Sequence, residues 1–276
     1  MNEAARVFRR PRLKNPSVIV GWAGGGGQMS GEVVDHLITR LQARPFAEIE
    51  PVGFFPLGGV SVEGSVARFP DSTFYAYPKG NLILFRSTPP GNEWSRFLEA
   101  VLDVAGKFGQ VRELYTVGAM VSMSAHTVPR QLVGVFNSPH LQQSVGEYGF
   151  ARPLDYETPS GQRPTVSSFL VWTAARRRVQ AASLWVPVPF YLLPLGDPKS
   201  KRKLLDFLSW RLELGLDLRD MDEEIDRKDR ALARLRTESP NIDSWMSRLE
   251  AHQVLSDEER QRLVQELASA LAEDET

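Results

Sequence analysis

The chain has 276 residues, with 33 basic and 34 acidic side chains that leave a net charge of -1. It contains no cysteine, which excludes disulfides, thiolate nucleophiles and cysteine-ligated metal centres and agrees with a cytoplasmic location. Its length is sufficient for one large core, and a hydrophobic content of 42% argues against disorder. The balanced charge provides no field that attracts phosphate backbones or anionic lipid, so nucleic acid is not expected as a partner.

Two segments bear on membrane targeting, the basic start of the sequence and its most apolar run. Residues 1–15 are basic but lack the apolar stretch of a signal peptide, and we expect them to form a solvated tail. The most apolar run, residues 183–195, is interrupted by three prolines and is shorter than the roughly 20 residues of a membrane-spanning helix. We therefore expect no membrane partner.

The chain begins with the pattern of a strand, a glycine loop and a helix. Residues 17–21 are mostly β-branched, and residues 24–27 are all glycine. Apolar residues at helical spacing then predict a helix: Val33, Val34, Leu37, Ile38 and Leu41. Further on, residues 82–85 form a continuous apolar run, which predicts a central strand that is covered on both faces.

Two further strand–helix–strand passages follow. Asn92 is placed to cap a helix whose apolar stripe extends to Ala105, before a strand at residues 114–117. The third passage has a strand around residues 132–136, a helix around 165–175 and a strand at 181–186. Alternating strands and helices predict the α/β fold class. The expected architecture is a three-layer α/β/α domain with a mostly parallel sheet, over residues 16–217.

Residues 218–276 are expected to form a helical appendix, because no strand pattern appears after residue 198. Apolar steps of three and four predict a short coiled-coil seam in its first helix. Ser239-Pro240 predicts the start of a second helix, and Ser256 with Glu259 predicts a capping box for a third. The apolar stripes need a partner surface. The candidate interface residues are Met221, Ile225, Leu232, Leu235, Trp245, Leu249, Leu263 and Leu267.

The glycine run is a candidate ligand loop, because a strand–glycine loop–helix arrangement points backbone N–H groups at one place. No Lys-Ser or Lys-Thr follows it, and its glycine spacing misses the dinucleotide fingerprint by one residue. A tight turn that lets helix and sheet pack closely explains the run better than phosphate binding does. The candidate ligand residues are Gly24, Gly25, Gly26, Gly27, His126 and Thr127.

The other reactive residues predict no catalytic group, metal or cofactor. The four histidines are dispersed and form no metal-binding pair. His126-Thr127 follows the strand that ends at Gly118, at the sheet edge where α/β proteins usually hold ligands. This makes His126 the best single pocket candidate, although an exposed loop histidine is the commoner explanation. A serine hydrolase is not indicated, because the chain has no Gly-x-Ser-x-Gly elbow.

A series of short motifs over about residues 16–220 carries a family resemblance. The motifs are Gly21-Trp22 with the glycine loop, Trp94 before residues 101–105, Val117-Gly118-Ala119, His126-Thr127 with Pro129, Ser183-Leu184-Trp185, Pro187-Val188-Pro189 with Tyr191, and residues 214–218. In their order and spacing they resemble the eukaryotic proteasome assembly chaperones and their archaeal and bacterial relatives. The resemblance implies a fold similar to nucleoside phosphorylases and hydrolases. Characterised relatives use it to bind proteasome α subunits and are not enzymes.

The resemblance also implies a homo-oligomer, and the helical extension looks like that of the bacterial branch. Three positions depart from the family pattern. Gly24 stands where an acidic residue is frequent, and Phe190 stands where histidine is frequent. Residues 272–276 lack the Tyr-containing ending by which some archaeal members dock into the α ring. Ligand chemistry at the first two positions and docking by the tail are therefore not expected.

Two functional hypotheses follow. The leading one is a non-enzymatic, protein-binding oligomer with an assembly-chaperone-like role, with proteasome subunits as candidate partners and the appendix supplying contacts. The alternative is a phosphorylase-like or hydrolase-like enzyme, or a nucleotide-binding protein, with its site near the glycine loop and His126. Only fold analogy carries that alternative.

Overall fold

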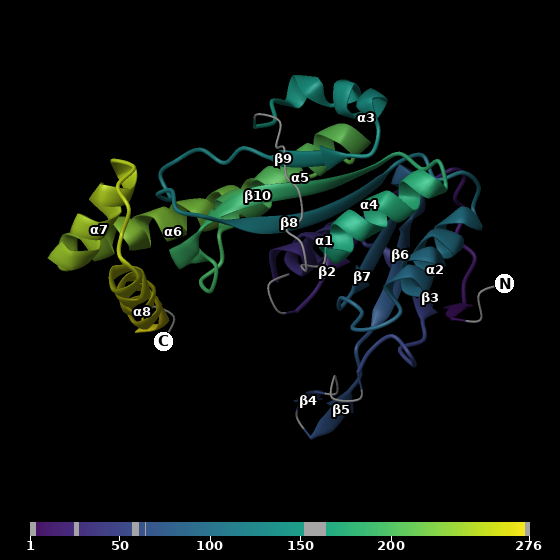
Figure 1. Ribbon diagram of the computed structural model, residues 1–276, viewed down its shortest axis with the longest axis horizontal. Helices are drawn as coiled ribbons and strands as arrows, with labels where there is room; N and C mark the ends of the chain where they lie inside the picture. The colour runs from purple at the N-terminus through teal and green to yellow at the C-terminus, as the bar shows by residue number, and fades with distance from the viewer. Residues whose placement is uncertain (1–3, 25–27, 57–60, 64, 152–163, 274–276) are drawn as a thin grey trace.

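A central mixed sheet organises the protein in this computed structural model, which describes residues 4–24, 28–56, 61–63, 65–151 and 164–273. Within them, eight strands form one sheet in the order β1-β3-β6-β7-β2-β8-β10-β9 (Figure 1). The strands are β1 (Ala5–Val7), β2 (Ser17–Trp22), β3 (Arg44–Ile49), β6 (Ser72–Tyr77), β7 (Leu82–Ser87), β8 (Leu114–Ser122), β9 (Val133–Phe136) and β10 (Ala181–Pro189). A separate hairpin pairs β4 (Ser61–Glu63) with β5 (Val66–Arg68).

The strand directions confirm an α/β sheet that is mostly parallel. β7, β2, β8 and β10 are parallel neighbours at the centre of the sheet. β3 points the same way, because it is antiparallel to β6, which is in turn antiparallel to β7. β1 and β9 run the other way at the two edges. The third predicted strand–helix–strand passage therefore differs from a parallel unit, because its first strand, β9, is antiparallel to β10.

Two helical layers cover the sheet, as the sequence predicts. α1 (Gln28–Arg40) and α5 (Pro198–Leu212) pack with Ile19 of β2 in one apolar cluster. α2 (Trp94–Gly106) and α4 (Val166–Arg176) pack on the opposite face with Val18 and Val20. This alternation along β2, with every residue of the strand buried, is that of a central strand. The shorter elements are η3 (Pro78–Gly80), α3 (Pro139–Ser144), η4 (Gly146–Tyr148) and η5 (Phe190–Leu192).

The start of α2 differs from the predicted cap. Asn92 does not cap this helix. Glu93 occupies the cap position with a left-handed backbone (φ 50°) and makes no side-chain cap hydrogen bond. The Trp94 indole N–H instead donates to the Pro90 carbonyl at 2.7 Å, which ties the first turn to the preceding loop. A tertiary contact thus takes the place of a local cap.

The basic N-terminal segment is part of the sheet edge, so the expectation of a solvated tail is wrong for it. Residues 5–7 pair with β3 as strand β1. The Phe8 and Arg9 backbone N–H groups both donate to the Phe46 carbonyl, and the Lys14 N–H donates to Asn81 Oδ1 at 2.9 Å. These bonds join segments far apart in the sequence, which a local pattern does not predict.

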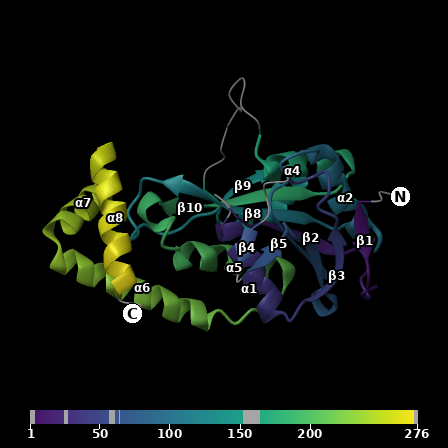
Figure 2. The ribbon, with the colours of Figure 1, turned by 90° about the horizontal axis from the view of Figure 1, so that it is seen from below.

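The appendix consists of three helices at the end of the molecule away from β1 (Figure 2). They are α6 (Arg219–Glu238), α7 (Pro240–Glu250) and α8 (Asp257–Glu273). Ser239 caps α7, and the reciprocal bonds between Ser256 and Glu259 form the predicted capping box of α8. α6 packs against α5, and α8 packs against η5 of the core. The appendix is therefore attached to the core through both its first and its last helix.

Gly21 allows α1 to lie against β2. A Cβ atom on Gly21 would lie 2.5 Å from Val34 Cγ2 and 2.7 Å from the Ser30 carbonyl oxygen. The Trp22 N–H also donates to Ser30 Oγ at 2.9 Å, which holds the two backbones together. The tight turn predicted for the glycine run falls mostly on Gly25, Gly26 and Gly27, which lie outside the described residues.

We expect Gly21→Ala to lower the free energy of unfolding by about 1–3 kcal/mol, because the added methyl group overpacks a rigid contact. Gly106→Ala is the matched control, since no atom lies within 4 Å of its added Cβ. That variant should be neutral or slightly stabilising. Urea denaturation measures both values. Equal effects of the two substitutions would contradict the packing role of Gly21.

Candidate functional site

The carboxyl ends of the parallel strands meet the appendix at one edge of the sheet. β8 ends at Ser122, and the segment that follows carries His126 and Thr127. β10 ends at Pro189 and leads directly into η5. Gly24 follows β2 at the same edge, with a φ of 88°. Among the described residues, no hydrogen bond or ion pair joins Gly24 to His126.

His126 is a buried structural residue, so the expectation of an exposed loop histidine is wrong. It is 6% exposed and lies edge-on to the Tyr191 ring. Its backbone N–H donates to the Tyr191 hydroxyl oxygen at 2.7 Å, and its Nδ1 lies 3.0 Å from the same hydroxyl. Burial, together with the nearby Lys199 ammonium, lowers the pKa of His126 to about 4. The imidazole is therefore neutral at pH 7 and ties the β8 loop to η5.

A buried ion pair holds the same loop against the start of α5. Arg130 Nε donates to Asp197 Oδ2 at 2.9 Å, and the two side chains are only 4% and 1% exposed. Arg130 Nε also lies 3.1 Å from Ser200 Oγ. Asp197 is the N-cap of α5, where its carboxylate accepts from the backbone N–H groups of residues 199 and 200. The pair therefore fixes both the loop and the helix start.

Thr127 lies at the joint between core and appendix. Its hydroxyl donates to Glu250 Oε1 of α7 at 3.3 Å. Arg236 of α6 donates to the same oxygen at 2.7 Å and so links the two appendix helices to the loop. Of the candidate ligand residues, His126 and Thr127 thus make contacts within the protein. The structure places them where the helical appendix docks.

Charge complementarity between α5 and α6 completes the joint. Lys199 pairs with Asp229 at 2.7 Å, and Arg202 pairs with Asp222. Lys228, a polar residue within the predicted coiled-coil seam, donates to the Leu195 carbonyl at 2.8 Å. The basic start of α5 is unfavourable for its own helix dipole, but the acidic face of α6 compensates for it. In the sequence, this joint is indicated by the basic residues at the start of α5 and the acidic residues of α6, which follows it in the chain.

The candidate interface residues of the appendix are mostly buried inside the chain. All of them except Ile225 pack in the same apolar cluster as residues of α1, α5 and η5. Seven of the eight are buried: Met221, Leu232, Leu235, Trp245, Leu249, Leu263 and Leu267. Ile225 is half-buried. The apolar stripes thus find partners within the chain, and direct contact between these residues and a second protein stays a prediction.

Exposed apolar side chains line two cavities at this joint, and we call them the carboxyl-edge surface: Val121, Met123, Leu193 and Val254. Met123 and Val254 are 53% and 80% exposed and line a cavity of about 330 Å³ between core and appendix, with Arg260 at its side. Val121 and Leu193 line a second cavity of about 400 Å³ beside α1. The sequence analysis missed this apolar surface, because its side chains come from separate segments: the end of β8, the segment after η5 and the segment before α8.

We also searched the described residues for a metal site and for membrane-spanning helices. None of their histidine, aspartate and glutamate side chains gather in a group of three that could hold a metal ion. In the same part of the chain, every helix is too short or too polar to cross a membrane.

The buried state of His126 predicts a pH-dependent stability. Its pKa is about 4 in the folded protein against 6.5 for the ordinary side chain, so the unfolded chain binds more protons between these values. Stability is therefore full above pH 6.5 and should fall by up to about 3 kcal/mol as the pH drops to 4. Urea denaturation at pH 7.5, 5.5 and 4.5 measures this loss.

His126→Gln should flatten that pH dependence, whereas His140→Gln, which changes an exposed histidine, should leave it intact. If His126→Gln retains the full pH dependence of the parent protein, another group is responsible for it.

Together, the fold and the joint define a class of protein: a three-layer α/β domain with a helical appendix docked at the carboxyl edge of its sheet. The PAC2 family model matches residues 18–236, and the chain belongs to the PAC2 family. The match includes the core and most of α6. This confirms the resemblance to proteasome assembly chaperones and their relatives.

Solved structures show the same fold in several organisms. A Mycobacterium tuberculosis protein of unknown function is 18% identical, with a TM-score of 0.76 and 90% of each chain covered. The Pyrococcus furiosus archaeal proteasome activator PbaB is 21% identical, with a TM-score of 0.67 over 85% of this chain and 99% of its own. A proteasome-assembly chaperone homologue of Mycobacterium tuberculosis is also 21% identical, with a TM-score of 0.66 over 79% and 94%. The search of curated proteins finds no match.

Proposed function

We propose that this PAC2 family protein is a non-enzymatic, assembly-chaperone-like protein that binds a protein partner through the carboxyl-edge surface. The observation that carries the proposal is that exposed Met, Val and Leu side chains line the two cavities at the joint. Exposed apolar surface of this kind is typical of protein-binding sites, and methionine adapts readily to the shape of a partner. The partner should therefore present a complementary apolar surface.

Proteasome subunits are the candidate partners. The Pyrococcus furiosus relatives of the same fold are a proteasome activator and a homologue of proteasome-assembly chaperones. By extension, this protein acts on proteasome α subunits, in the cytoplasm and as a homo-oligomer. This extension rests on family membership and on the carboxyl-edge surface together.

The environment of His126 favours binding over the alternative of an enzyme at this edge. A general base must come within hydrogen-bond reach of its substrate. The His126 side chain is only 6% exposed and its Nδ1 faces the Tyr191 hydroxyl, so little of the ring is accessible to a substrate. The same residue that suggested a pocket therefore supports the attachment of the appendix.

Affinity capture of the tagged protein from its own lysate tests the proposal. We expect mass spectrometry to identify proteasome α subunits, and light scattering on the purified protein to give a mass above that of one chain. The capture should be repeated at high salt, which an apolar contact resists better than a charged one does. Recovery of a lone monomer would contradict both parts of the proposal.

A further inference from the structure

Residues 8–12, which follow strand β1, form an exposed basic segment at one end of the molecule. The backbone N–H groups of Phe8 and Arg9 both donate to the carbonyl of Phe46 on β3, so the segment is fixed against the sheet. The Phe8 side chain is 46% exposed. Three arginines of the segment are exposed and belong to no ion pair among the described residues: Arg9, Arg10 and Arg12. We call residues 8–12 the basic end segment.

A groove of opposite charge lies in the appendix, where the end of α6 and the start of α7 pack beside α8. It encloses about 430 Å³, and we call it the distal groove. Leu235, Ile242 and Ala270 give it an apolar floor, and its charged lining residues are Glu238 and Glu266. Within the described part of the chain, no lysine or arginine lines this groove. It therefore combines apolar surface with uncompensated negative charge.

Both carboxylates of the distal groove are available to a cation. Glu266 accepts from the Ser239 hydroxyl at 3.4 Å and takes part in no ion pair among the described residues. Glu238 pairs with Arg234 of the same helix at 3.4 Å, but these two side chains are 58% and 48% exposed. Exposed pairs of this kind contribute little to stability, so Glu238 can exchange its partner for another arginine.

The basic end segment and the distal groove lie at opposite ends of the molecule (Figure 2). One chain therefore cannot bring them together, whereas two copies can. Arginine binds carboxylates through charged hydrogen bonds, and arginine and aromatic side chains are enriched where proteins meet. A phenylalanine followed by two arginines thus matches a groove with an apolar floor and two carboxylates.

We propose that residues 8–12 of one copy dock in the distal groove of the next copy, with Phe8 on the apolar floor and the arginines against the two carboxylates. This docking rests on the proposed function, in which the protein is a homo-oligomer, and it supplies the contact between copies. Because the two surfaces differ, the contact is head-to-tail and joins copies into a ring or a chain rather than a two-fold dimer. Among the described residues, the distal groove shares no lining residue with the cavities of the carboxyl-edge surface.

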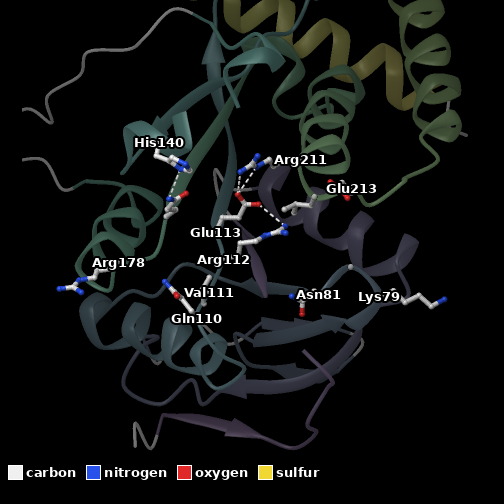
Figure 3. Close-up of a pocket in the computed structure, with 13 residues that line it drawn as sticks. Lys79, Asn81, Gln110, Val111, Arg112, Glu113, His140, Arg178, Arg211 and Glu213 are labelled. Atoms are coloured by element: carbon white, nitrogen blue, oxygen red, sulfur yellow. Dashed lines mark hydrogen bonds and ion pairs between the residues drawn. The ribbon is translucent and has the colours of Figure 1, made fainter. Parts of the chain in front are cut away.

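Two other exposed cations provide a matched control. Lys79 and Arg178 lie at a polar pocket of about 670 Å³ beside the start of β8 and point away from it in opposite directions (Figure 3). Glu113, which lines this pocket, is buried and accepts from Arg211 Nη2 at 2.7 Å and from the Tyr115 hydroxyl at 3.0 Å. Lys79 and Arg178 are exposed and belong to no ion pair among the described residues. Reversing their charges therefore alters neither of the proposed surfaces.

Light scattering of the full chain at low salt tests the docking. We expect Arg9→Glu combined with Arg10→Glu to weaken self-association at least roughly tenfold, because like charges then face each other in the groove. Glu238→Lys combined with Glu266→Lys should have the same effect for the same reason. An equimolar mixture of the two double variants should associate again, since each altered surface then meets one of opposite charge. High salt should weaken the association of the parent protein.

The control, Lys79→Glu combined with Arg178→Glu, should associate as the parent protein does, and equal weakening there would show an effect of net charge alone and overturn the docking. Undiminished association in the two double variants would overturn it as well, while leaving the homo-oligomer of the proposed function intact. So would a mixture that stays apart, with circular dichroism verifying that each variant folds. A parent protein with the mass of one chain would contradict both the docking and the homo-oligomer. Partner capture by the carboxyl-edge surface is a separate measurement, which these variants should leave unchanged.

Discussion

Replacing Asp197 with alanine should lower the free energy of unfolding by about 3–5 kcal/mol. The substitution leaves the Arg130 guanidinium buried without its carboxylate partner, since that side chain is only 4% exposed. It also removes the N-cap of α5, whose first turn begins beside the joint. The loop with His126 and the start of α5 should then lose their common anchor, and urea denaturation measures the loss.

Asp222→Ala is the matched control for this prediction. Asp222 also pairs with an arginine, Arg202, but its side chain is 54% exposed. Exposed pairs contribute about 0–1 kcal/mol, so this variant should unfold nearly as the parent protein does. A similar loss for both variants would contradict the distinction between buried and exposed pairs at the joint.

Replacing Leu263 with alanine should lower the free energy of unfolding by about 2–5 kcal/mol. Leu263 of α8 is fully buried, and it belongs to the same apolar cluster as Leu205 of α5 and Tyr191 of η5. Because the cluster is continuous from core to appendix, the loss should shift a single unfolding transition for the whole chain. The division at residue 217 then separates two parts of one cooperative unit.

Leu193→Ala provides the comparison, since Leu193 is exposed on the carboxyl-edge surface and should contribute little to folding. Tryptophan fluorescence and far-ultraviolet circular dichroism should report the same midpoint for Leu263→Ala. Two separate transitions, with the core midpoint unchanged, would mean that the appendix folds on its own.

Local patterns predicted most of the elements correctly. The continuous apolar run at residues 82–85 is the buried strand β7, and Thr165 caps α4 near the expected start. The capping box of α8 and the proline start of α7 depend on residues close together in the chain, so the sequence predicts them. The family resemblance further indicated which α/β fold these elements form.

Contacts between distant segments were not predictable in this way. Strand β1 forms because residues 5–7 find the free edge of β3, about 40 positions away. β9 reverses because it completes the sheet next to β10 rather than continuing the parallel series. In both cases, the partner strand decides the outcome, and the segment itself carries no local sign of it.

The contacts of the candidate site were likewise not predictable from local sequence patterns. The His126-Thr127 signal pointed to the correct segment, but the Tyr191 hydroxyl and Glu250 turn it into a joint. The polar pocket beside the start of β8 draws single residues from several separate segments, so no motif in the sequence predicts it.

A matched pair of valine substitutions tests most directly whether the carboxyl-edge surface binds the protein partner. Val254 lies on that surface and is 80% exposed, whereas Val52, in the loop after β3, is 84% exposed. Both changes to aspartate should leave folding intact, since neither side chain is buried. Quantitative affinity capture should then show at least a roughly tenfold loss of α subunits for Val254→Asp and no loss for Val52→Asp. Undiminished capture by Val254→Asp, or equal losses in both variants, would contradict the account.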